Sequence, residues 1–213
     1  FASSVKLLFA GGIAAQAGLI KNFENNLNKG DITSTANCRQ VSFGGLFGKV
    51  TENNSVVLAG TPSTGKISVS GYESGSNTWQ FIGGIAGIVT SEVSFIGSEI
   101  NPCTLNNSII VAAEAKTINF GALGGVVGSS GDNGANTSTG KKMTIKNITV
   151  NGDIKYSGSG TAFIADLKAC LGGILGSSNS ACEIEGCINK AKVYMGDGNL
   201  AQKNGKYAKY FGF

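Results

Sequence analysis

Paired carboxylates are the first residues to consider for chemistry, because the chain of 213 residues contains no histidine. Without imidazole there is no Ser-His or Cys-His nucleophile pair. Glu183 and Glu185 lie two apart on one face of an expected strand, and paired carboxylates are what a polysaccharide-cleaving enzyme would need. A solvated strand edge explains this pair more simply. We therefore expect no catalytic, cofactor-binding or metal-binding residues, and predict that the protein is not an enzyme.

Residues 60–66 (GTPSTGK) carry most of a phosphate-binding P-loop. The motif fails at Ile67, where magnesium binding needs Ser or Thr, and residues 67–70 read as a strand in place of the required helix. We interpret this segment as a turn that leads into a strand. The turns at Asp132 and Asp197 lack the spaced acidic ligands of a dedicated calcium site and are interpreted as ordinary turns.

The cysteines are five in number and none forms a C-x-x-C pair, so neither a fully paired disulfide framework nor a zinc site is indicated. Cys182 and Cys187 are spaced for a short disulfide loop or for two inward positions on neighbouring strands, and both alternatives stay open. We favour small buried thiols for this set, which is Cys38, Cys103, Cys170, Cys182 and Cys187.

The segments near the two termini each resemble a functional motif: a signal peptide at the N-terminal end and a nucleic-acid-binding surface at the C-terminal end. Residues 5–17 have the lysine, apolar run and Ala-x-Ala of a signal peptide, but residues 9–14 align with residues 81–86, so we interpret the stretch as a first repeat. Residues 203–213 mix lysines with aromatic residues as nucleic-acid surfaces do. Because Gly212 stands where another repeat is due, we interpret residues 206–213 as the start of a further turn, and expect no nucleic-acid partner. No apolar run is long enough to span a membrane.

A doubled glycine between apolar residues is the feature that organises the chain. It recurs five times at intervals of 33 to 48 residues, and a small residue follows three positions after the second glycine. We expect these pairs to occupy equivalent structural corners: Gly11 and Gly12, Gly44 and Gly45, Gly83 and Gly84, Gly124 and Gly125, Gly172 and Gly173. Glycine suits a corner because it can adopt positive φ and leaves no side chain between stacked backbones.

A second word, small-charged-β-branched-polar, follows each glycine pair, as in residues 30–33, 65–68, 152–155 and 191–194, with a degraded copy at 108–111. Each repeat therefore has about three strand-like segments, one of them the alternating residues 142–148. Glycine accounts for 33 residues. Hydrophobic residues account for 41% of the chain and the net charge is only +4, which argues against disorder. Helix signals are scarce.

These observations predict an all-β fold, a repetitive parallel β-solenoid (β-helix) of about five turns with surface loop insertions at residues 71–77, 131–140 and 157–161. A β-sandwich is the alternative. One domain of residues 1–213 would contain repeats at about 5–38, 39–76, 77–116, 117–166 and 167–205. In this fold the residues before the glycine pairs form one apolar column, and those after them form another: Phe43, Ile82, Leu123 and Leu171, then Leu46, Ile85, Val126 and Ile174.

Residues 44–48 (GGLFG) and 172–176 (GGILG) resemble the GLUG-type repeats of bacterial surface adhesins and related secreted proteins. Residues 184–189 resemble the Ile-x-Asn-Cys segment that often follows that motif, with Gly186 in place of the Asn. The resemblance implies a cell-surface or secreted β-helical stalk or adhesin without catalytic residues. N-x-S/T sequons begin at Asn53, Asn106, Asn136 and Asn147, and support a secretory route in a eukaryotic source.

The leading hypothesis is a non-catalytic, extracellular or cell-surface structural or adhesive protein, a glycine-rich solenoid stalk or filament segment. Its loops would bind host or matrix glycans or proteins, or it would assemble with itself through an open C-terminal sheet edge. A polysaccharide-acting β-helix enzyme is the second hypothesis. An ice-binding solenoid is the third, and would need a regular ladder of Thr-x-Thr.

Overall fold

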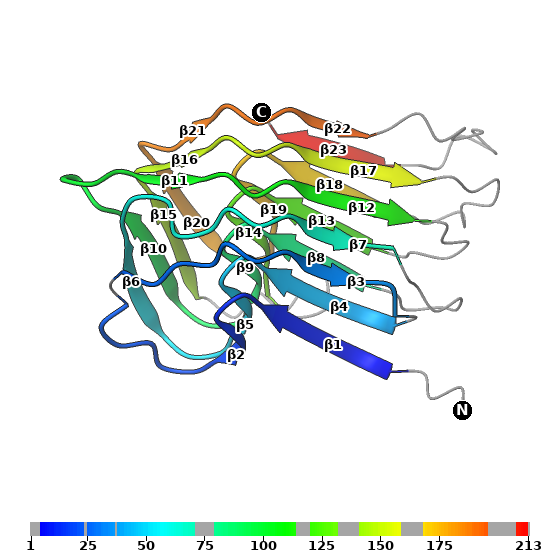
Figure 1. The fold of residues 1–213 in the computed structure, drawn as a ribbon, viewed down its shortest axis with the longest axis horizontal. Coiled ribbons are helices and arrows are strands. Elements are labelled where there is room, and N and C mark those ends of the chain that lie inside the picture. The colour runs from blue at the N-terminus through cyan, green and yellow to red at the C-terminus, as the bar shows by residue number, and fades with distance from the viewer. Residues whose placement is uncertain are drawn as a thin grey trace.

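The computed structural model describes residues 5–23, 25–36, 38–70, 79–113, 120–131, 141–158, 168–195 and 208–212. All the regular secondary structure in these ranges is β-strand, and the strands stack in layers from one end of the molecule to the other (Figure 1). They form five sheets, which we number 1 to 5 in the order in which the third winding, residues 79–113, passes through them. No helix in the described ranges is long and apolar enough to pass through a bilayer.

Sheets 1 and 2 flank the glycine pairs. Sheet 1 leads into each pair and comprises β1 (Val5–Gly11), β4 (Cys38–Gly44), β8 (Trp79–Gly83), β13 (Phe120–Gly124), β18 (Lys168–Gly172) and β23 (Ala208–Gly212). Sheet 2 leads away from it and comprises β2 (Ala14–Ala17), β5 (Phe47–Val50), β9 (Ala86–Val89), β14 (Val127–Ser130) and β19 (Leu175–Ser178).

Three further sheets complete each winding. Sheet 3 comprises β6 (Asn54–Leu58), β10 (Val93–Gly97), β15 (Lys142–Lys146) and β20 (Ala181–Glu185). Sheet 4 comprises β11 (Cys103–Leu105), β16 (Ile148–Val150) and β21 (Ile188–Asn189). Sheet 5 comprises β3 (Ile32–Ser34), β7 (Ile67–Val69), β12 (Ile109–Ala113), β17 (Ile154–Gly158) and β22 (Val193–Met195), so the degraded second word falls in line with the others.

All pairings between described strands are parallel, and each joins one winding to the next. This is the predicted parallel β-solenoid, and the β-sandwich alternative, which needs antiparallel sheets, is wrong. After five windings β23 pairs with β18, Gly212 opposite Gly172, so the C-terminal residues do start a further turn.

The glycine pairs stack at one corner. In sheet 1 the first glycines are in register, Gly11 with Gly44, then Gly83, Gly124 and Gly172. Of the two reasons that the sequence suggested for these glycines, positive φ is wrong, because no glycine of these pairs lies in the left-handed region. The second reason, close backbone approach, holds: a Cβ added at Gly44 would clash with the carbonyl oxygen of Phe47 in the same corner and lie 2.5 Å from that of Ile85 in the next winding.

The second glycine of each pair contacts the opposite wall of the solenoid, at the end of sheet 4 or in the segment that leads to sheet 5. Asn28 Nδ2 donates a 2.9 Å hydrogen bond to Gly45 O, and a Cβ added at Gly125 would lie 2.6 Å from Cγ1 of Val150. Each winding is therefore pinched at the corner, which divides the interior into two apolar cores.

The two predicted apolar columns enter different cores. Phe43, Ile82, Leu123 and Leu171 are at most 1% exposed and face the core between sheets 1 and 5. Leu46, Ile85 and Val126 are fully buried in the core enclosed by sheets 2, 3 and 4, and Ile174 is partly buried against it. The residues on either side of the corner therefore contribute to both cores. Burial of each large side chain in the two columns stabilises the fold by about 1.5–3 kcal/mol.

The windings hold more strands than the sequence predicted. The third to fifth windings pass through all five sheets, whereas about three strands per repeat were expected. Residues 142–148 were interpreted as one alternating stretch, but Asn147, at φ 55°, breaks them into β15 and β16. Gly186 holds the equivalent corner in the fifth winding at φ 60°, so the Gly-for-Asn exchange keeps a left-handed conformation that both residue types tolerate.

The first winding differs from the others. Among the described residues it has no strand in sheet 3, and the chain between β2 and β3 folds inward. The Phe23 ring packs 5.3 Å from that of Phe47, and Asn54 Nδ2 donates to Gly18 O at 3.0 Å. These contacts cover the N-terminal end of the core formed by sheets 2, 3 and 4.

Candidate functional site

The acidic pair takes part in surface ion pairs. Glu183 and Glu185 lie on the outward face of β20, where Lys146 contacts them at 2.6 and 2.7 Å and Lys142 also pairs with Glu183. Hydrogen bonds from Lys142 and then Lys146 lower the pKa of Glu183 to about 2. Glu183 is therefore not poised as a general acid, which needs a raised pKa. The alternating Lys and Glu side chains form an ion-pair ladder on the surface.

The P-loop-like segment runs along a corner and enters β7, as the sequence indicated. Ser63 is buried and accepts a 2.9 Å hydrogen bond from Asn107 Nδ2, while Lys66 donates its backbone N–H to Asp31 Oδ1 at 2.8 Å. No helix N-terminus is present to hold a phosphate in this segment. The two Asp turns and the Asn136 sequon lie outside the described residues.

None of the five cysteines forms a disulfide, and they only partly fit the expectation of buried thiols. Cys38 and Cys103 are buried, Cys170 and Cys187 are intermediate and Cys182 is exposed. Burial raises the pKa of Cys103 to about 12, so its thiol is inert at neutral pH. Within the described ranges no cluster of Cys, Asp or Glu is arranged for a metal.

The outward faces of sheets 1 and 2 face each other and form a narrow wedge beside the glycine corner, which we call the wedge. The small residue that follows each glycine pair brings the two sheets together: a Cβ at Gly87 would lie 2.5 Å from the Phe43 N, and one at Gly48 would lie 2.7 Å from the Ala10 N. Ser42 Oγ also donates a 2.7 Å hydrogen bond to Gly48 O. The small residue therefore allows sheets 1 and 2 to come into close contact, a role that the sequence analysis did not predict.

The wedge is filled with apolar side chains in the third and fourth windings. Phe81 and Ile88 are each 3% exposed and Ala122 is fully buried, and they form a third small hydrophobic cluster. Trp79 stacks on Phe81 with ring centroids 6.4 Å apart, and Cys170 packs against the same cluster. This part of the wedge is ordinary core.

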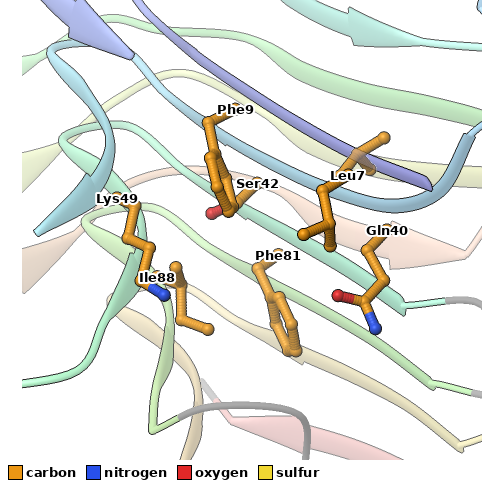
Figure 2. Close-up of a pocket in the computed structure, with 8 residues that line it drawn as sticks. Leu7, Phe9, Gln40, Ser42, Lys49, Phe81 and Ile88 are labelled. Atoms are coloured by element: carbon orange, nitrogen blue, oxygen red, sulfur yellow. The ribbon is translucent and has the colours of Figure 1, made fainter. Parts of the chain in front are cut away.

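The wedge is open in the first two windings. A hollow of about 200 Å³ lies there between β1, β4 and β5, with Phe81 and Ile88 from the third winding closing it on one side (Figure 2). Its other side chains, all pointing toward the same space in Figure 2, are Leu7, Phe9, Gln40, Ser42 and Lys49. The Lys49 Nζ lies 5.6 Å from the centre of the Phe9 ring. This hollow is the candidate functional site.

Strand register shows which side chains of neighbouring windings meet at the hollow. On sheet 1, Ser42 lies between Phe9 and Phe81 in one column, and on sheet 2 Lys49 is paired with Ile88. The second winding thus carries polar residues where the third carries large apolar ones. The fourth winding carries Ala122 and Ser129 at the same two positions and both are buried, so these positions alone do not distinguish the open part from the filled part.

No protein-family model, curated protein or solved structure matches this chain. The function is therefore argued from the fold and from the wedge.

Proposed function

We propose that the protein is a non-catalytic, cell-surface or secreted structural and adhesive solenoid. It serves as a stalk or fibre segment that presents loops for binding glycans or proteins. The resemblance to GLUG-type repeats of adhesins points the same way. The proposal also agrees with the ion-paired state of Glu183, the strongest hydrolytic candidate in the sequence.

The observation that carries the proposal is the position of the long connections. Residues 71–78, 114–119, 159–167 and 196–207 each join the end of a sheet 5 strand to the start of the next sheet 1 strand. Because the windings are in register, the attachment points of these four connections form one column along the solenoid. A rigid scaffold with its variable segments attached in one column is suited to display and binding.

Self-assembly is the second element of the proposal. In the described residues β23 pairs with β18 on one side and has no strand on its other side. Parallel strand edges accept another strand readily. Either a further winding of the same chain or a second copy would extend sheet 1 there and lengthen the fibre.

A loop-exchange experiment tests the display role. Residues 159–167 are replaced by a Gly-Ser segment of equal length, and attachment of beads coated with the protein to glycan and matrix-protein arrays is measured. The matched control replaces residues 132–140, which join sheet 2 to sheet 3 and lie outside the column. We expect the first replacement to reduce attachment at least tenfold and the control to preserve it, with both melting temperatures near that of the parent.

Two results would count against the proposal. One is equal attachment by both replacements. The other is release of reducing sugar from any polysaccharide on the array, which would favour the enzyme hypothesis. Protease treatment of intact source cells provides the test of location, because a surface protein is cleaved while a cytosolic control protein is not.

A further inference from the structure

The hollow in the wedge has the construction of a small binding site, separate from the loop column. Its floor is rigid, because Phe81 and Ile88 are each 3% exposed and belong to strands paired on both sides. Phe9 and Leu7 from β1 supply further apolar wall, and Leu7 is 52% exposed at the rim. The site is therefore built on strands, which position side chains better than loops do.

The polar groups of the hollow are few and lie on opposite walls. Lys49, from β5, brings an ammonium group whose nitrogen lies 5.6 Å from the Phe9 ring centre. Gln40, from β4, brings an amide on the other side of the space in Figure 2. The Ser42 hydroxyl proton is already donated to Gly48 O, at 2.7 Å. A ligand would thus meet one cation and one amide.

Charge complementarity favours an anion. Among the described residues that line the hollow, Lys49 carries the only formal charge, and it is positive. An anionic group beside an ammonium that is partly shielded from water gains more than it would in bulk solvent. A carboxylate is the anion that also leaves room for an apolar body.

The volume sets the size of that body. About 200 Å³ is below the 300–1,000 Å³ of common drug-sized sites but above the roughly 150 Å³ cavity that accepts benzene. One ring or one branched alkyl group with its carboxylate fits this space. Aromatic rings also stack favourably on Phe9 and Phe81.

Hydrogen-bond satisfaction decides between an apolar acid and an acidic sugar. A hexuronic acid brings several hydroxyls, and each one buried without a partner costs roughly 1–3 kcal/mol. The hollow offers Gln40 and Lys49 as donors and little else. We therefore propose that it binds a small aromatic or branched aliphatic carboxylate, with the carboxylate at Lys49 and the apolar body between Phe9, Phe81 and Ile88.

Isothermal titration of the whole 213-residue chain with phenylacetate tests this assignment. We expect a Kd of about 1 mM or tighter, which is within the range for so small a ligand. Phenylethanol and phenethylamine, which keep the ring but lose the negative charge, should bind at least tenfold more weakly. The affinity should fall as salt rises, because the contact is ionic. Trp79, the single tryptophan, stacks on Phe81 and supplies a fluorescence readout.

Two variants and a matched control locate the site. Lys49→Gln should weaken phenylacetate at least tenfold. Gln40→Trp copies the residue that the next winding carries at the same register, Trp79, so it should fold, fill the hollow and abolish binding. Lys155→Gln is the control, because Lys155 Nζ lies 5.5 Å from the Tyr194 ring on the outside of sheet 5, the same pairing away from the hollow. It should leave the Kd unchanged.

Several outcomes would overturn the assignment. These are equal affinity for phenylacetate and phenylethanol, tighter binding of glucuronate than of phenylacetate, unchanged binding in a folded Gln40→Trp protein, or no heat and no fluorescence change with 20 mM phenylacetate at low salt, a concentration of about 20 Kd. Loss of bead attachment in the loop-exchange experiment is independent of all of them, so the display role and this site can fail separately.

Discussion

The open and filled parts of the wedge have the same backbone and opposite properties. In both, sheets 1 and 2 are in contact through a small residue after the glycine pair. The strands of sheet 1 also stay in register from one winding to the next. In the third winding Phe81 and Ile88 fill the space, and in the second Ser42 and Lys49 leave it open. The strand register is the same in both parts, so the cavity arises from the side chains and not from a change in strand pairing.

The difference also predicts where stability resides. Large side chains that fill a cavity contribute transfer free energy and packing together, whereas half-exposed ones contribute a fraction of it. The filled part should thus be sensitive to truncation and the open part tolerant. The following predictions test this contrast, in order of expected effect.

Gly87→Ala should have the largest effect, because the added methyl group would meet backbone on two sides, with the Phe43 N at 2.5 Å and the Phe81 O at 2.8 Å. Backbone cannot rotate away as a side chain can, so we expect a loss of at least about 4 kcal/mol in urea unfolding, or failure to fold. Ala15→Gly is the control, since the first winding already carries an exposed Ala at this position. A loss below about 1 kcal/mol for Gly87→Ala would show that the sheets separate easily.

Phe81→Ala should lower the free energy of unfolding by about 3–5 kcal/mol, the usual cost of emptying a buried Phe site. Phe9→Ala, in the same column but only half-buried at the open end, should cost about 1 kcal/mol. Chemical denaturation of the two variants side by side measures the contrast directly. Equal losses would mean that the open part is packed as tightly as the filled part.

Ser42→Ala removes the 2.7 Å hydrogen bond to Gly48 O and leaves that carbonyl buried, so a loss of about 1–2 kcal/mol is expected. The variant also copies Ala122, the residue two windings further along the column. Urea denaturation monitored by circular dichroism measures the change. If stability does not fall, close backbone contact alone holds the two sheets together.

Glu183→Gln should have the smallest effect, because the ion pairs on sheet 3 are largely exposed and screened by water. Its pKa is lowered to about 2 from 4.5, so the ionised group stabilises the folded state above about pH 4.5, and this contribution is lost as the pH falls towards 2. Thermal melts between pH 2 and 6 should show parent and variant converging at the acid end. A gap that widens below pH 4 would contradict the assignment.

Much of the architecture was readable from the sequence. The recurring glycine word predicted the parallel solenoid and the stacked corners, and both apolar columns lie where expected. Of the two reasons given for the glycines, positive φ was wrong, because no glycine of these pairs lies in the left-handed region, whereas close backbone approach agrees with the contacts that a Cβ at Gly44 would make with Phe47 O and Ile85 O. Asn147 was also missed as a corner, since an alternating pattern does not reveal a single left-handed residue.

The hollow could not be predicted in the same way. Its lining comes from β1, β4, β5, β8 and β9, in three windings and two sheets. The alternation of each strand indicates which side chains point outward, but not that two outward faces oppose each other. That fact follows from the small residue after each glycine pair, whose partner, for example Phe43 for Gly87, lies in the preceding winding.

The parallel register has a mechanical consequence. Hydrogen bonds between windings point along the solenoid axis, so a force applied along that axis loads them in series and should peel one winding at a time. Each released winding of 33 to 48 residues would extend by about 110–170 Å. A tether of this kind would lengthen in steps under tension and dissipate energy at every step, which protects whatever bond anchors its far end.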